Sequence, residues 1–145
     1  MDNRPIGIFD SGIGGLTAVK EIIRVLPAED IVYFGDTARV PYGTKSPSTV
    51  MKFSIENALF LLRFKVKLIV VACNTSSSYS IPLLKSNFKV PAVGVITPGA
   101  QAAAKTTRTG RIGIIGTSAT IRSRAYENEI KNINPRLKVF SRACP

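Results

Sequence analysis

The sequence contains no histidine, and this absence excludes several kinds of site. A Ser-His-Asp triad or a Cys-His pair cannot be assembled from these 145 residues alone, and zinc sites with imidazole ligands are excluded as well. Cysteine is also scarce, with Cys73 and Cys144 the two present. Two cysteines do not make a disulfide framework, so we expect both to be reduced thiols.

Long apolar runs are absent from the sequence too, and its first residues do not have the pattern of a signal peptide. No run approaches the roughly 20 apolar residues that a membrane-spanning helix needs. Residues 1–10, MDNRPIGIFD, carry a proline and acidic or amide side chains where a signal peptide has a basic and then an apolar stretch. We therefore expect a cytoplasmic protein without a membrane partner.

Acidic residues are few, and the formal net charge is +11. Residues 1–72 carry 9 Lys or Arg against 7 Asp or Glu, whereas residues 73–145 carry 11 against 2. These basic residues are scattered singly, without the clustering or interleaved aromatic residues that nucleic-acid surfaces use. We expect no nucleic-acid partner, and interpret the excess as a solvated basic face that attracts a small anionic substrate.

Short aliphatic runs alternate with helical patterns along the chain. The runs are apolar on both faces and predict buried strands over residues 6–10, 30–36, 67–73, 91–96, 111–117 and 137–144. Helices are predicted over 14–27, 47–64 and 118–130. Pro27 ends the first of these, and Ser46 with Pro47 forms an N-cap and first-turn pair for the second.

This alternation predicts an α/β fold with doubly wound, mainly parallel sheets. The sequence stops directly after the last predicted strand, where the pattern requires a helix, so we expect the chain to be a fragment. A further helix should follow Cys73, and Pro82 is expected to displace its start or kink it.

Ligands of parallel sheets bind beyond the carboxyl ends of the strands. Short polar side chains collect at these ends: Asp10, Ser11, Asp36, Cys73, Asn74, Thr75, Thr97, Thr117, Ser118 and Thr120. Other interpretations remain open, because Asp, Ser and Thr also cap helices and a lone cysteine is often a small buried apolar residue. At the start of a helix, however, Cys73 would be held as a thiolate in an electropositive and partly open position.

A nucleotide cofactor is a further alternative for the glycine-rich turn DSGIGGLT. Counting from Gly12, Thr17 stands where a dinucleotide-binding turn has its third glycine, and Asp10 would place a carboxylate beside a pyrophosphate. A phosphate-binding G-x4-G-K-[ST] loop is absent from the sequence as well. We expect no cofactor.

Five segments in order, GIFDSGIGGLTAVKEI, YFGDTARVPYG, VVACNTSSS, GVITPGAQAA and IGIIGTSATIRS, resemble the amino-terminal part of glutamate racemases. These enzymes belong to the cofactor-independent aspartate/glutamate racemase superfamily. The likeness covers all 145 residues, and the combination of DSG, PYG and CNT is specific where each motif alone would be weak.

The resemblance implies interconversion of L- and D-glutamate for peptidoglycan, without pyridoxal phosphate or metal, by two cysteines on opposite faces of the substrate. Cys73 matches the first cysteine, and Asp10 with Ser11 matches the pair that supports this thiol and contacts the substrate. The other matching positions are substrate-binding: Pro41, Tyr42, Gly43, Asn74, Thr75, Thr117 and Thr120. The family also implies a full-length homodimer and two similar lobes with the active site between them, here residues 1–96 and the truncated start of a second lobe over 97–145.

The two-cysteine chemistry suits the reaction, because inversion needs a proton removed from one face and another delivered to the opposite face. The family's second cysteine lies in a Gly-Cys-Thr-His motif that these residues do not contain. Cys144 also follows a strand and is an alternative candidate for the second cysteine, although it matches a family position without a catalytic role. Two alternatives remain: a racemase of aspartate or another amino acid, and a non-catalytic protein that holds a small anion with Asp10, Thr75 and Thr117.

Overall fold

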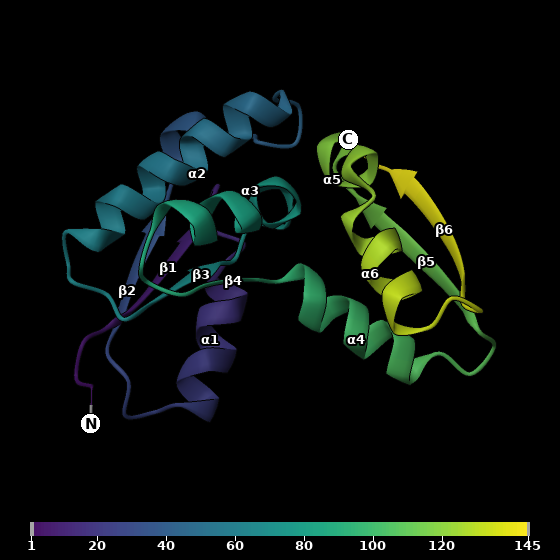
Figure 1. The fold of residues 1–145 in the computed structure, drawn as a ribbon, viewed down its shortest axis with the longest axis horizontal. Coiled ribbons are helices and arrows are strands. Elements are labelled where there is room, and N and C mark those ends of the chain that lie inside the picture. The colour runs from purple at the N-terminus through teal and green to yellow at the C-terminus, as the bar shows by residue number, and fades with distance from the viewer. Residues whose placement is uncertain (1, 145) are drawn as a thin grey trace.

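The computed structural model describes residues 2–144, in which six strands form two separate parallel sheets (Figure 1). The first sheet has the order β2-β1-β3-β4 and the second pairs β5 with β6. The strands are β1 (Ile6–Asp10), β2 (Ile31–Gly35), β3 (Leu68–Val71), β4 (Ala92–Gly94), β5 (Arg111–Gly116) and β6 (Lys138–Ala143). The predicted parallel α/β fold is confirmed.

Helices cover both faces of the first sheet, as a doubly wound fold requires. They are α1 (Leu16–Val25), the 3-10 turn η1 (Thr37–Arg39), α2 (Pro47–Leu62) and α3 (Asn74–Asn87). Figure 1 shows α2 and α3 on one side and α1 on the other. Successive side chains of β1 point to opposite faces of the sheet. Phe9 packs with Leu61 of α2 and Leu84 of α3. Ile8 packs on the other face with Val19 and Ile22 of α1.

The second sheet is covered by α4 (Ile96–Thr106) and α6 (Ala125–Ile133), with the short helix α5 (Ser118–Ser123) at the carboxyl end of β5. Its core contains Ala100, Ile112, Ile130 and Leu137. The predicted boundary between residues 96 and 97 falls at the first turn of α4, and the division into two similar lobes stays a prediction.

The predicted helices differ from the structure in three places. Residues 118–130 form two helices because Arg124, between them, adopts a left-handed conformation with φ of 55°. The strand predicted over 91–96 is shortened to β4, and α4, which was not predicted, begins at Ile96. Pro82 lies inside α3 and does not displace the helix start at Asn74. Among residues 2–144, no helix has the length and apolar character needed to cross a membrane.

Candidate active site

Cys73 occupies the N-cap position of α3, directly after β3. Its Sγ accepts a hydrogen bond from the Ser76 amide at 3.4 Å and donates to Ser11 Oγ at 3.2 Å. The Ser11 hydroxyl can rotate, so the same neighbours would both donate to a thiolate. The predicted helix start after Cys73 is confirmed. The prediction that its thiol is partly open is wrong, because Cys73 is only 4% exposed.

Asp10 ends β1, the strand next to β3, and its carboxylate is buried. Oδ2 accepts a hydrogen bond from the Gly15 amide at 2.8 Å, which ties the glycine-rich turn to the strand. Gly15 is needed for this approach, because a Cβ there would lie 2.7 Å from the Asp10 Cβ. One carboxylate oxygen is thus used structurally. In the described part of the chain no hydrogen bond reaches the other oxygen, Oδ1, which a ligand ammonium group could contact.

Three threonine hydroxyls form a cluster that joins the two sheets. Thr75 Oγ1 lies 3.0 Å from Thr117 Oγ1 and 3.1 Å from Thr120 Oγ1, and the last two atoms lie 3.0 Å apart. Thr75 belongs to the first turn of α3, whereas Thr117 caps α5 and Thr120 lies within it. Hydroxyls are rotatable donors, so this cluster can turn from bonding itself to bonding a carboxylate.

A cavity of about 460 Å³ adjoins this cluster, and Asn74, Thr117, Thr120 and Tyr126 contribute to its lining. The Tyr126 hydroxyl donates to Asn74 Oδ1 at 2.6 Å, so the Asn74 Nδ2 is left as a donor for a ligand. Burial raises the pKa of Tyr126, which keeps its hydroxyl protonated. Sequence reasoning missed Tyr126, because nothing in its local pattern distinguishes it from other aromatic residues on a helix.

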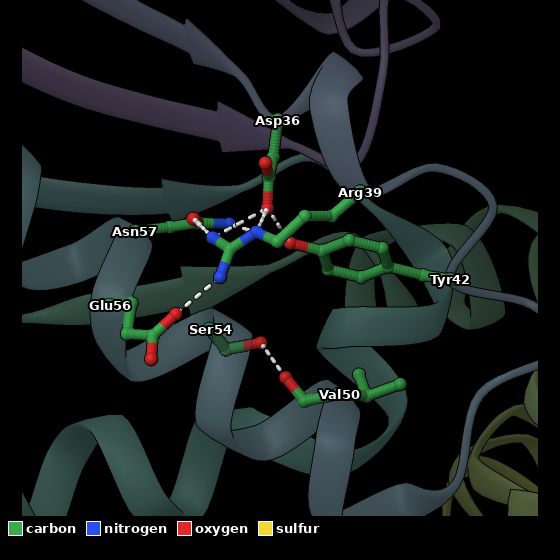
Figure 2. Close-up of polar contacts among 7 residues, drawn as sticks. All are labelled: Asp36, Arg39, Tyr42, Val50, Ser54, Glu56 and Asn57. Carbon is green, nitrogen blue, oxygen red and sulfur yellow. Dashed lines mark hydrogen bonds and ion pairs between the residues drawn. The ribbon is translucent and has the colours of Figure 1, made fainter.

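The PYG segment contributes backbone rather than side-chain groups to this region. Pro41 follows a cis peptide bond and is exposed, while Tyr42 is 1% exposed and its hydroxyl contacts Asp36 and Asn57 (Figure 2). Gly43 O accepts a hydrogen bond from the Ala119 amide at 3.1 Å. The structure therefore directs the Tyr42 hydroxyl into the first-sheet interior and leaves the Gly43 backbone at the junction with the second sheet.

Only some of the predicted site residues contact one another in the structure. Ser11 contacts Cys73, and Gly43 contacts the threonine cluster. Asp36 is buried and instead contacts Tyr42 and the half-buried Arg39. Thr97 is exposed on α4 and lines a different groove with Ser77. Cys144 is exposed after β6, with its amide bonded to Gly116 O. In residues 2–144, no group of three or more Cys, Asp or Glu side chains could hold a metal ion.

The family model for Asp/Glu/Hydantoin racemase matches residues 6–144. The chain belongs to this racemase family. A curated glutamate racemase from Geobacter metallireducens is 60% identical over 145 residues, and one from Streptococcus mutans is 50% identical over the same length. The aligned region is all of this chain but 54% and 55% of those two relatives, so this chain spans about half their length.

Solved structures of glutamate racemases share this fold. A glutamate racemase isoform from Bacillus anthracis has a TM-score of 0.96 and 47% identity, covering 100% of this chain and 55% of that one. A glutamate racemase from Francisella tularensis, solved with D-glutamate, has a TM-score of 0.90 and 47% identity, covering 99% and 54%. The racemase family fold is thus shared through both sheets of this chain.

Proposed function

We propose that the protein carrying this chain is a glutamate racemase in which Cys73 is one of two thiol acid-base groups. The observation that carries the proposal is the position of the Cys73 thiol at the amino end of α3, next to the Ser76 amide and the Ser11 hydroxyl. Both neighbours can donate hydrogen bonds to a thiolate, the form that can accept a proton from carbon. Glutamate is proposed as the substrate because the curated relatives from Geobacter metallireducens and Streptococcus mutans are named glutamate racemase.

In this proposal the Cys73 thiolate removes the Cα proton, so that the C–H bond breaks and an S–H bond forms. The electron pair passes into the adjacent carboxylate, and the second thiol delivers a proton to the opposite face of the carbon. The thiol and thiolate exchange roles in the reverse direction. The resemblance places the second thiol in a Gly-Cys-Thr-His motif that these residues do not contain, so the activity belongs to the complete protein.

The substrate carboxylates are assigned to the hydroxyls of Thr75, Thr117 and Thr120 and to the free amide donor of Asn74. These donors, with backbone N–H groups at the start of α3, would stabilise the charge that builds on the carboxylate as the Cα proton leaves. Asp10 is assigned to the ammonium group through Oδ1. Pro41, Tyr42 and Gly43 form one wall of the site, with backbone atoms toward the substrate.

The wider expectations remain part of the proposal. The protein would work without pyridoxal phosphate or metal, act in the cytoplasm as a homodimer, and supply D-glutamate for peptidoglycan. The basic excess of residues 73–145 suits an anionic substrate, because a positive field raises its local concentration.

Exchange of the Cα hydrogen in D₂O tests the proposal against its alternatives. The complete protein should incorporate deuterium at Cα of L-glutamate, followed by NMR, at least tenfold faster than at Cα of L-aspartate or L-alanine. Faster exchange with L-aspartate would reassign the substrate. Binding of glutamate without exchange would favour the non-catalytic anion-binding protein.

A further inference from the structure

A polar network with Asp36, Tyr42 and Asn57 buried at its centre ties the segment 36–43 to helix α2 (Figure 2). The Tyr42 hydroxyl donates to Asp36 Oδ2 and accepts from Asn57 Nδ2 at 3.1 Å. Arg39 Nε donates to Asp36 Oδ2 at 2.7 Å, and its terminal nitrogens reach Asn57 Oδ1 at 2.9 Å and the Glu56 carboxylate. Each member therefore has at least two partners or a charged partner, which makes the segment rigid.

Gly43, the residue after Tyr42, contacts the residues that follow β5 of the second sheet. Gly43 packs so closely on Thr117 that a Cβ would lie 2.5 Å from the Thr117 Cβ and Cγ2 atoms. Gly43 O also accepts the Ala119 amide hydrogen bond. The peptide bond between Tyr42 and Gly43 is planar, so a shift of the Tyr42 backbone moves the surface on which Thr117 and Ala119 rest.

We propose that Tyr42 is a positioning residue whose hydroxyl, through Asp36 and Asn57, sets the place of Gly43 against Thr117. This position fixes the spacing of Thr117 and Thr120 from Thr75, where the substrate carboxylate is assigned. The inference rests on the proposed function for its effect on substrate. Under this proposal Tyr42 of the PYG motif is not a substrate-binding side chain. Its hydroxyl acts on the site through the position of Gly43 and does not contact the substrate.

Ser54 offers a matched control on the same helix. Its side chain is 0% exposed, and its hydroxyl donates to Val50 O at 2.8 Å within α2, as Figure 2 shows. It also accepts a hydrogen bond from Ser80 at 2.8 Å. Loss of this hydroxyl removes buried hydrogen bonds from α2, as loss of the Tyr42 hydroxyl does, but none of its bonds reaches the segment 36–43.

The test compares Tyr42→Phe with Ser54→Ala in the complete protein, using amide hydrogen exchange of Ala119 and steady-state kinetics with glutamate. Tyr42→Phe should speed exchange of the Ala119 amide at least tenfold and raise KM about five- to tenfold with kcat within threefold. Ser54→Ala should leave both quantities within twofold even if it lowers the unfolding temperature equally. Should Tyr42→Phe fail to fold, Arg39→Lys is the second variant, because lysine lacks the planar fork that reaches Glu56 and Asn57 together.

Unchanged Ala119 exchange in Tyr42→Phe would overturn the proposal, as would faster exchange with an unchanged KM. Equal effects of Tyr42→Phe and Ser54→Ala would reduce the network to a stabilising role. If the parent protein racemises no amino acid, the proposed function fails, and the Ala119 exchange rates alone decide whether Tyr42 positions Gly43.

Discussion

The side-chain oxygen of Thr75 lies 3.0 Å from that of Thr117, although 42 positions separate the two residues in the chain. Thr75 follows a strand of the first sheet and Thr117 follows a strand of the second. The pair therefore marks the point where the carboxyl ends of the two sheets meet. Cys73 lies two residues before Thr75 at the start of the same helix, which places a thiol and a cluster of hydroxyl donors together.

Thr75→Val should weaken substrate binding, because valine keeps the branched shape but removes one hydroxyl of the threonine cluster. The hydrogen bond proposed from this hydroxyl to the substrate carboxylate is lost, and a hydrogen bond to a charged group is worth about 1.5–3 kcal/mol, so KM for glutamate should rise at least about tenfold. Initial rates over a range of glutamate concentrations measure the effect. A KM within twofold of the parent would remove Thr75 from the binding site.

Gly43→Ala should force the two sheets apart, because the new Cβ would meet Thr117 at 2.5 Å. Overpacking of this kind costs typically 1–3 kcal/mol, so both the unfolding free energy and the glutamate affinity should fall. Gly113→Ala is the control, since a Cβ there has no heavy atom within 4 Å. Urea unfolding and KM measure the two variants, and indistinguishable results for both would contradict the close Gly43 contact.

Tyr42 should make stability fall at high pH. Burial raises the pKa of Tyr42, and the hydrogen bond to Asp36 raises it further. Above about pH 10 an unfolded tyrosine loses its proton while the folded one keeps it, so the unfolded state binds fewer protons and stability decreases as pH rises. Above pH 10 the unfolding free energy of the parent should fall by up to about 1.4 kcal/mol per pH unit more than that of Tyr42→Phe. Parallel pH profiles in urea unfolding would contradict this.

Local patterns predicted much of the first sheet. Ser46 caps α2 as expected, accepting a hydrogen bond from the Thr49 amide at 3.1 Å, and α1 ends before Pro27. The break at Arg124 was not predictable, because a left-handed conformation at an arginine has no composition cue. The start of α4 was also missed, since β4 is short and the apolar run continues into the helix at Ile96.

The candidate site shows a similar division. The strand ends located Cys73 and Asp10, because the carboxyl ends of parallel strands meet at one edge. The direction of the Tyr42 side chain was not predictable, since its partner Asn57 lies 15 positions away on α2 and only the tertiary structure brings them together. The burial of Cys73 also depends on neighbours distant in sequence, among them Tyr42 and Val50.

The central claim is that Cys73 is a proton-transfer group for glutamate, and circular dichroism of L-glutamate racemisation tests it most directly. In the complete protein, Cys73→Ser should slow racemisation at least about a hundredfold, because a hydroxyl is a far weaker acid than a thiol. Cys144→Ser, the same change at the exposed cysteine, should stay within a fewfold, on the order of 1 kcal/mol in barrier. Racemisation by Cys73→Ser at the parent rate would contradict the account, and activity lost instead on Cys144→Ser would make Cys144 the proton-transfer group.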